Sequence, residues 1–376
     1  MNTISSRINF YKTRKRNFKK LFRLLNVNFM KILEAIKILI QKSDLSFDLS
    51  KSVMNEIMEE RVTPSQFGSF VTALKLKGET PEEIAGMATV MRSKSLSISS
   101  TSKLLGTCGT GGDNKGTINI STASAIVSSS SGAKVAKHGN RAMSGSTGSA
   151  DVLEKLGVKI SLSPDSVKTC IDQIGIGFIF AQSFHPAMKF AAPLRKEIGI
   201  PTIFNILGPL TNPANAERQL IGVSNPELAP KVAEALKILN IRKALVVHGF
   251  DGMDEISVEG NTIIWEVTSE IVKRRKTRPS DFSLSEGRNS DLIVSSTEES
   301  ADIIKKVFQG EGSNPNDSSP ISSCRKAIII NSAASLVAYG ITDNFQEASS
   351  LASQSIDSGE SFQKLNQLIK ITNELE

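Results

Sequence analysis

The stretch that decides the fold is Leu-Leu-Gly-Thr-Cys-Gly-Thr-Gly-Gly-Asp at residues 104–113, echoed by Lys-Val-Ala-Lys-His-Gly-Asn-Arg-Ala at residues 134–142. In each stretch a short apolar run enters a glycine-bearing loop, and a helical pattern follows. Short apolar runs that alternate with helices are typical of an α/β domain. We therefore expect an α/β fold with a central mixed sheet, whose predicted strands begin in these two runs and continue at residues 177–180, 202–206, 220–223 and 244–247.

The chain before this region has a different pattern. Residues 30–98 carry apolar side chains at helical spacing, which predicts a small N-terminal helical domain. Thr63-Pro64 supplies a cap and a first-turn proline, Gly78 ends that helix, and Thr80 with Glu83 forms a capping box for the next. Residues 99–376 are then the larger α/β domain.

Three further segments of the α/β domain have local signals. Ile256 to Val267, with Gly260-Asn261 between them, predicts a β-hairpin. Residues 310–323 are rich in Ser, Pro, Asn and Gly and predict a loop, which the helix expected at residues 326–338 follows.

Composition narrows the classes of protein. A chain of 376 residues with 39% hydrophobic residues suits a globular protein of two domains. The longest uncharged apolar stretch, residues 198–216, contains three prolines and cannot be a membrane helix. Three scattered cysteines without a C-x-x-C motif argue against disulfides or a zinc site and fit a reducing compartment.

The net charge of +7 belongs to the N-terminus. Residues 1–29 hold eight Lys or Arg and no acid, so 37 basic and 38 acidic residues remain elsewhere, a net of −1. A neutral body gives no electrostatic basis for binding nucleic acid. The basic extension itself has three interpretations: a targeting segment for organelle import, a disordered arm, or residues upstream of a true start at Met30.

Two glycine-rich loops are candidate phosphate sites. Gly109 to Asp113 follows a predicted strand and precedes a helix whose cap would be Ser121 or Thr122. Backbone N–H groups at such a helix start attract phosphate, although this is neither a Rossmann fingerprint nor a P-loop. The basic residues 137–142 and the Ser/Gly-rich residues 144–149 repeat the arrangement. Two such loops could hold one polyphosphate from two sides, whereas an ordinary turn and a solvated basic loop are the alternatives.

Asp254-Glu255 follows the predicted strand at residues 244–247. Adjacent carboxylates without a His or Cys cluster suit Mg²⁺, and a solvated acidic turn is the alternative. Arg195 lies in an apolar region and could clamp a carboxylate or form a structural ion pair. No histidine adjoins a Ser or Cys nucleophile motif, so triad chemistry is not expected.

The order of the motifs is similar to that of the anthranilate phosphoribosyltransferase family. The resemblance spans residues 30–370 and rests on GTGGD, NIST, KHGNRA, GSADVL, FHPAMK, RKEIG, TIFNILGPLTNPA and DGMDEIS. It implies a fold shared with pyrimidine nucleoside phosphorylases, with the active site between a helical and an α/β domain. It also implies a homodimer formed through the helical domain, and transfer of phosphoribose from phosphoribosyl pyrophosphate (PRPP) to anthranilate in tryptophan biosynthesis.

Matching motifs imply the site residues. Those for PRPP would be Gly109, Gly112, Asp113, Thr117, Asn119, Ile120, Ser121, Thr122, Lys137, His138, Gly139, Asn140, Arg141, Ala142, Ser144, Gly145 and Ser149. Those for anthranilate would be Gly109, Asn140, His185, Met188, Arg195 and Pro209. Those for the Mg²⁺ cofactor would be Ser121, Asp254 and Glu255.

The sequence departs from the family pattern in places. Ser146 stands where bacterial members often carry Lys, Pro201 replaces a common Arg, and the 310–323 loop is longer. Two other functions remain open: a related transferase or phosphorylase that acts on a nucleobase, and a non-catalytic nucleic-acid-binding relative. Asn140, the His-Pro-Ala-Met segment at residues 185–188 and Arg195 favour a carboxylated aromatic ring as the acceptor, and the neutral body argues against nucleic acid as a partner. We expect a cytoplasmic enzyme without a membrane partner, with organelle import through residues 1–29 as the alternative.

Overall fold

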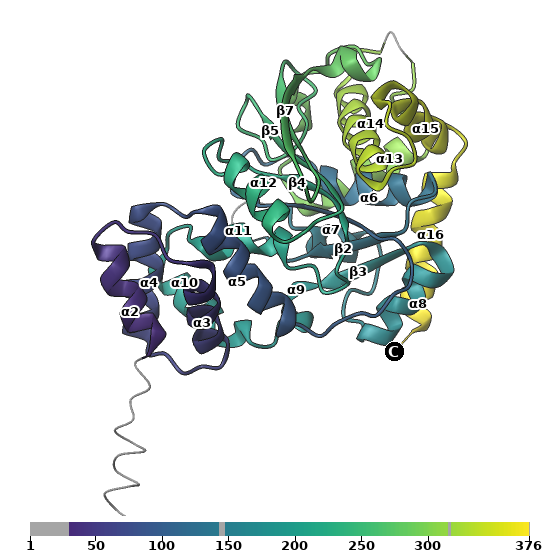
Figure 1. The fold of residues 1–376 in the computed structure, drawn as a ribbon. Coiled ribbons are helices and arrows are strands. Elements are labelled where there is room, and N and C mark those ends of the chain that lie inside the picture. Colours follow the sequence, from purple (N-terminus) through teal and green to yellow (C-terminus); the bar gives the residue numbers. More distant parts are fainter. Residues whose placement is uncertain (1–29, 143–146, 315–316, 376) are drawn as a thin grey trace, which may run out of the picture.

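A seven-stranded mixed sheet forms the centre of the computed structural model, which describes residues 30–142, 147–314 and 317–375 (Figure 1). The strand order is β3-β2-β1-β4-β5-β6-β7. The first five strands in this order are parallel to one another, and β6 pairs antiparallel with both β5 and β7. The sheet is therefore mixed, which confirms the prediction. The strands are β1 (Leu105–Gly109), β2 (Val135–Gly139), β3 (Ile176–Phe180), β4 (Arg218–Gly222), β5 (Lys243–Gly249), β6 (Thr262–Val267) and β7 (Val272–Thr277).

Helices cover both faces of the sheet because alternate strand residues are apolar on each side. Leu245 and Val247 of β5 belong to the core on the α14 side, whereas Ala244 and Val246 belong to the core on the α12 side. The helices of this domain are α6 (Ile120–Ser130), α7 (Ser149–Lys155), α8 (Pro164–Ile174), α9 (Ala181–Phe184), α10 (Met188–Ile198), α11 (Ile203–Leu210), α12 (Ala229–Ile238), α13 (Thr297–Phe308), α14 (Pro320–Tyr339), α15 (Phe345–Asp357) and α16 (Glu360–Glu374), with short 3-10 turns η1 (Pro279–Phe282) and η2 (Asn289–Leu292).

The N-terminal helices form a bundle beside the sheet (Figure 1). They are α2 (Lys31–Ile40), α3 (Phe47–Met58), α4 (Pro64–Lys77) and α5 (Pro81–Ser93). The start signals are confirmed, because Thr63 with Gln66 and Thr80 with Glu83 both form capping boxes. Gly78 ends α4 with a φ of 87°, a conformation that favours glycine.

The predicted strand at residues 202–206 is wrong. These residues begin α11, and the side chain of Asn205 accepts a hydrogen bond from the Thr202 N–H at its first turn. Ile203, Phe204 and Ile206 are buried because α11 lies between the bundle and the sheet, and periodicity alone cannot assign such a short apolar run to a buried helix or a buried strand. Both α10 and α11 share the apolar core of the N-terminal bundle, so that core uses residues distant in sequence.

Two other local expectations need correction. The hairpin at residues 256–267 is wrong: β6 pairs instead with β7, and residues 256–259 form a loop. The strand β7 has the sequence Val-Lys-Arg-Arg-Lys-Thr, in which the exposed charges of a sheet edge hide the strand pattern. Helix α14 begins at Pro320, inside the predicted 310–323 loop, with proline in its first turn. The expectations for residues 1–29, Ser144, Gly145 and Ser146 lie outside the described residues.

Within the described ranges no helix is long and apolar enough to cross a membrane.

A buried ion pair joins the bundle helices. The Lys77 ammonium lies 2.7 Å from the Glu83 carboxylate, and these side chains are 4% and 0% exposed. Glu83 also accepts hydrogen bonds from the N–H groups of Leu45 and Thr80. One carboxylate therefore satisfies a helix start, a loop and a buried cation.

We expect Glu83→Ala to lower the free energy of unfolding by about 3–5 kcal/mol, because the buried Lys77 ammonium then keeps the exposed Asp44 carboxylate as its remaining ion-pair partner and the N–H groups of Leu45 and Thr80 lose their acceptor. The neighbouring Glu82 is exposed, so Glu82→Ala is the matched control and should change it by less than about 0.5 kcal/mol. Urea unfolding of both variants measures the difference. Equal losses would show that the buried pair does not hold the bundle together.

Candidate active site

The candidate site lies where the parallel strands end. Strands β1, β2, β4 and β5 run in the same direction, so their carboxyl ends meet at one edge of the sheet. The two glycine-rich loops leave β1 and β2 at this edge, and Asp254-Glu255 follows β5 there. In open α/β sheets this edge is where ligands bind.

Asp254 lies against the ends of β1 and β4. Its Oδ2 accepts a 2.7 Å hydrogen bond from the N–H of Gly111. A side chain at Gly109 would overlap the Asp254 carboxylate, and one at Gly222 would overlap the Asp254 backbone. Glycine is therefore required at both strand ends because the acidic segment fills the space. Gly222 was not among the expected residues, although its place at the end of an apolar run could have indicated it.

The two glycine-rich loops are tied to each other. The amide of Asn119 donates to the carbonyl oxygen of Thr147 over 2.7 Å. The hydroxyl of Thr147 donates to the carbonyl oxygen of Thr117 over 2.9 Å. Asn119 is also the N-cap of α6, since its Oδ1 accepts from the N–H of Thr122. The predicted cap at Ser121 or Thr122 is wrong, because both residues lie inside the first turn.

Lys137 of β2 contacts the neighbouring strand β1 and the start of α6. Its buried ammonium donates to the carbonyl oxygen of Thr107 at 2.8 Å and to the hydroxyl of Ser121 at 3.0 Å. Burial lowers the pKa of this ammonium, while the nearby Glu255 and Asp254 carboxylates oppose the shift. A lysine of β2 thus shares its surroundings with the acidic pair and with the start of α6.

The acidic pair is crowded and shielded from water. Burial and the charge of Asp113 raise the pKa of Asp254 to about 6. Burial and the charge of Asp254 raise the pKa of Glu255 well above its ordinary value, and Lys137 only partly offsets this. Crowded carboxylates of this kind are stabilised by a cation. Asp113, from the first loop, therefore belongs to the same electrostatic cluster.

This donor set fits Mg²⁺ held together with a phosphate ligand. Among the described residues, no three His, Cys, Asp or Glu side chains are arranged to hold a metal ion by themselves. Mg²⁺ is usually bound by one or two carboxylates, with substrate phosphates and water completing its oxygen ligands. Asp254, Glu255 and the Ser121 hydroxyl can supply the protein's share.

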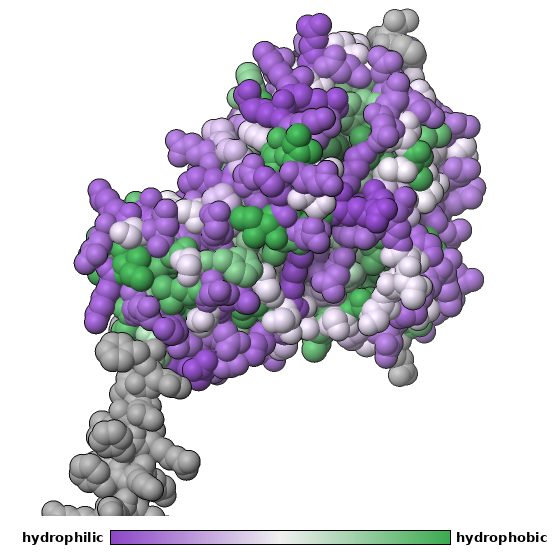
Figure 2. Space-filling model, viewed as in Figure 1, coloured by the Kyte–Doolittle hydropathy of each residue, from purple (hydrophilic) through white to green (hydrophobic). Residues whose placement is uncertain are grey.

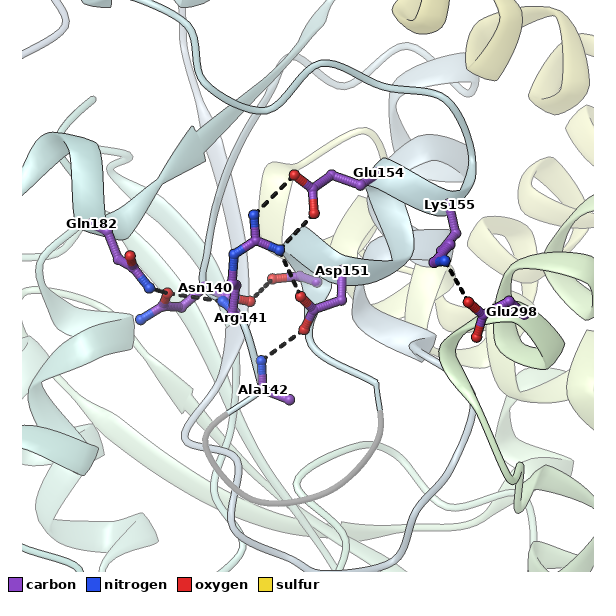
Figure 3. Close-up of polar contacts among 9 residues, drawn as sticks. Asn140, Arg141, Ala142, Asp151, Glu154, Lys155, Gln182 and Glu298 are labelled. Carbon is purple, nitrogen blue, oxygen red and sulfur yellow. Dashed lines mark hydrogen bonds and ion pairs between the residues drawn. The ribbon is translucent and has the colours of Figure 1, made fainter. Parts of the chain in front are cut away.

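The second loop is held by α7 (Figure 3). The Arg141 guanidinium donates to Glu154 through two nitrogens and to Asp151 at 2.9 Å, and these carboxylates raise its pKa. Asp151 also accepts from the N–H of Ala142. The charge of Arg141 is therefore already paired, so its side chain fixes the loop here. Sequence reasoning missed Asp151 and Glu154, which lie at helical spacing on α7.

Asn140 begins the same loop, directly after β2. Its Oδ1 accepts hydrogen bonds from the N–H of Arg141 and from the amide of Gln182 on α9 (Figure 3). Its carbonyl oxygen accepts from the Ser149 hydroxyl at 3.3 Å. Gly139 lies so close to Ser149 that a side chain there would overlap the hydroxyl. No sequence motif indicated Gln182, which folding brings beside Asn140 from 42 residues away.

The expected anthranilate residues gather on the bundle side of this edge. The rings of His138 and His185 are 5.2 Å apart. Burial lowers the pKa of His138 to about 3 and that of His185 to about 4, so both rings are neutral near pH 7. Met188 begins α10, and its N–H donates to the carbonyl oxygen of His185. Pro209 is buried in α11.

Arg195 is a half-buried cation on α10. Its guanidinium lies 5.5 Å from the centre of the Phe204 ring and 3.5 Å from Oδ1 of Asn205. Burial lowers the pKa of the guanidinium. Within the described part of the chain no carboxylate lies within ion-pair distance of it, so the structural ion pair considered from the sequence is not formed.

Comparison with known proteins identifies the family. The helical bundle domain of the glycosyl transferase family matches residues 33–95, and the a/b domain of that family matches residues 101–362. An anthranilate phosphoribosyltransferase from Herpetosiphon aurantiacus is 48% identical over 345 residues, covering 92% of this chain and 100% of the relative.

Solved structures agree. The anthranilate phosphoribosyltransferase of Thermus thermophilus is 37% identical with a TM-score of 0.83, covering 90% of this chain and 99% of the other. The Saccharomyces cerevisiae enzyme, solved in complex with PRPP and Mg, is 29% identical with a TM-score of 0.83, covering 92% and 98%. The phosphate loops, the acidic pair and these similarities lead to one conclusion: the chain belongs to the anthranilate phosphoribosyltransferase family.

Proposed function

We propose that this chain transfers the phosphoribosyl group of PRPP to the amine of anthranilate, giving N-(5-phosphoribosyl)anthranilate and pyrophosphate in tryptophan biosynthesis. The observation that carries the proposal is the convergence of three segments. Asn119 and Thr147 tie the two glycine-rich loops together, and Gly111 ties the first loop to Asp254. One diphosphate with its metal ion would contact all three.

The first loop and the start of α6 would hold the diphosphate and ribose. Gly111 and Gly112 have φ values of 65° and 77°, so the loop bends in a conformation that glycine adopts readily. Backbone N–H groups in such a bend attract an anion, whereas the N–H groups of Ile120 and Thr122 at the start of α6 already donate to Ile118 and Asn119. Gly112, Asp113, Thr117, Asn119 and Thr122 would line this part of the site.

The second loop would complete the PRPP site through Lys137, Gly139, Asn140 and Ser149. Ionised Lys137 would contribute positive charge from below, where it already meets Ser121. Arg141 takes a different part than its motif implies, because Asp151 and Glu154 already neutralise its guanidinium. We propose that it positions the loop, and that the ligand is contacted by Lys137, Asn140 and Ser149 instead.

Asp254, Glu255 and Ser121 would hold Mg²⁺ against the diphosphate. When bound, the metal ion neutralises negative charge that develops as pyrophosphate leaves. The buried carboxylates suit this role because burial and the charges of neighbouring acids raise their pKa values, and a cation relieves that repulsion.

The anthranilate site would lie between the His138–His185 pair and α10. Neutral imidazoles and the buried Pro209 offer an aromatic ring an apolar surrounding. Arg195 offers a cation to the carboxylate of anthranilate. Among the described residues, no protein carboxylate lies within ion-pair distance to compete for it. Asn140 would lie between the two substrates, with Met188 and Gly109 as further walls.

The transfer reaction does not require a strong catalytic base. The aromatic amine is already neutral near pH 7, so no side chain needs to activate it. The chain's task is to hold the amine in line with C1 of the ribose, which can supply about 7–11 kcal/mol at best. Donors fixed at the loop then stabilise the leaving pyrophosphate without reorganisation.

We also propose a homodimer through the helical domain. Leu33, Ile40 and Leu76 of the bundle are 37%, 69% and 81% exposed, and apolar surface gathers over these helices in Figure 2. Exposed apolar patches mark contact surfaces.

The boundary between the helical and α/β domains near residue 98 and the cytoplasmic location stay predictions.

The activity can be tested by following the loss of anthranilate fluorescence with PRPP and Mg²⁺. We expect turnover that stops when the metal is chelated. Asp254→Asn and Glu255→Gln should each lower kcat/KM on the order of 100-fold or more, because each removes stabilisation of the leaving group. Thermal unfolding of the variants should stay near that of the parent chain.

Glu270→Gln, a change at an exposed acid in the β6–β7 turn, is the matched control and should keep full activity. Near-normal turnover of both active-site variants at limiting Mg²⁺ would contradict the metal assignment. Turnover of a nucleobase in preference to anthranilate would contradict the acceptor.

The acceptor clamp has a separate test. Arg195→Ala should raise the KM for anthranilate about 10-fold or more, because a charge-assisted hydrogen bond contributes about 1.5–3 kcal/mol. The KM for PRPP should change little, since Arg195 lies on α10 and away from the phosphate loops. Lys196→Ala, at the exposed neighbouring position, is the control. An unchanged KM for anthranilate would refute the clamp.

A further inference from the structure

A second polar cleft lies at the opposite edge of the sheet from the candidate active site. It has a volume of about 710 Å³ and is lined by residues 97–104, 214–215, 217–218 and 242. These are the segment before β1, the segment entering β4, and the residue before β5. The cleft therefore collects the amino ends of parallel strands, whereas the active site collects their carboxyl ends.

Positive charge dominates the cleft. Lys103, Arg218 and Arg242 line it, with Glu217 as the acid among its lining residues. Within the described ranges Lys103 and Arg242 have no carboxylate within ion-pair distance, and Arg218 reaches Glu217 only at 3.9 Å. Nearby, Lys243 is already paired with Asp343, and Lys134 donates to the Ser102 hydroxyl. The cleft thus holds an excess of cations that its own acids do not neutralise.

Arg218 and Lys103 are in unfavourable surroundings as a result. The Nε of Arg218 is buried without a hydrogen-bond partner, and its side chain is 13% exposed. Burial, and then the charge of Arg218, lower the pKa of the Lys103 ammonium. A bound anion would relieve the repulsion between the two cations.

We propose that this cleft binds a small phosphate-bearing anion. Guanidinium and ammonium groups bind phosphate oxygens through charge-assisted hydrogen bonds, and serine and threonine hydroxyls add neutral donors. The lining offers both kinds, since Ser99 and Thr101 lie beside the cations. The volume suits a small metabolite. This inference goes beyond the proposed function, because no residue of the cleft belongs to the transferase site.

The location gives such an anion a structural consequence. The segment before β1 is the covalent connection between the helical bundle and the sheet. Its Ile98 N–H donates to the carbonyl oxygen of Pro213, and its Leu96 N–H donates to that of Phe184. An anion that bridges Lys103 on this connection to Arg218 and Arg242 on the sheet would suppress opening of the connection.

Hydrogen exchange followed by mass spectrometry tests the proposal locally, with inorganic phosphate as the probe. At about twice its Kd, phosphate should slow exchange in a peptide covering residues 97–104 about threefold, because binding suppresses opening. Sodium chloride at equal ionic strength should not. Lys103→Gln/Arg242→Gln should lose this protection and keep transferase activity, since both residues lie away from the phosphate loops. Arg218 is left intact because it packs against Gly340.

Arg274→Gln, which removes an exposed arginine from β7, is the matched control and should keep the protection. Protection by chloride as strong as by phosphate would overturn the proposal, as would protection that survives in the double variant. If the parent chain has no transferase activity, the proposed function is refuted but the exchange result is unaffected, so the two failures are distinguishable.

Discussion

The hydrogen bond between the Gly111 N–H and the Asp254 carboxylate is the constraint on which the candidate site depends. It joins a loop that leaves β1 to a segment that follows β5, across 143 residues of chain. The contact is possible because Gly109 and Gly222 have no side chains where Asp254 lies. Parallel strands bring these ends to one edge, and the absence of two Cβ atoms lets the acid approach the phosphate loop.

Electrostatics then divides the site into two environments. On the sheet side, Asp113, Asp254 and Glu255 crowd around Lys137 and the start of α6, and their charges favour a cation with a polyphosphate. On the bundle side, burial keeps His138 and His185 neutral, and Arg195 is a cation without a protein partner acid in the described ranges. A polyanionic donor and a carboxylated aromatic acceptor would therefore occupy separate environments that meet near Asn140.

The fold class, the capping boxes and the convergence of the three motifs could be predicted from the sequence, because glycines, caps and apolar runs act locally. The errors have physical reasons. Residues 202–206 are a short, mostly apolar run because α11 is buried between the bundle and the sheet, and so short a run has no period that distinguishes a helix from a strand. The charged residues of β7 gave no apolar strand pattern. They are tolerated there because β7 is an edge strand that pairs with β6 on one side only. The roles of Gln182, Asp151 and Glu154 depend on contacts that form only on folding. The assignments of individual residues to PRPP, anthranilate and Mg²⁺ stay predictions.

The most direct test of the central claim is a crystal structure of the chain with PRPP and Mn²⁺, which replaces Mg²⁺ and is located by anomalous scattering. One diphosphate should contact the backbone of Gly112 and lie near Lys137, with the metal ion between its oxygens and the Asp254–Glu255 carboxylates. A metal ion bound elsewhere, or a diphosphate that contacts one loop alone, would contradict the account.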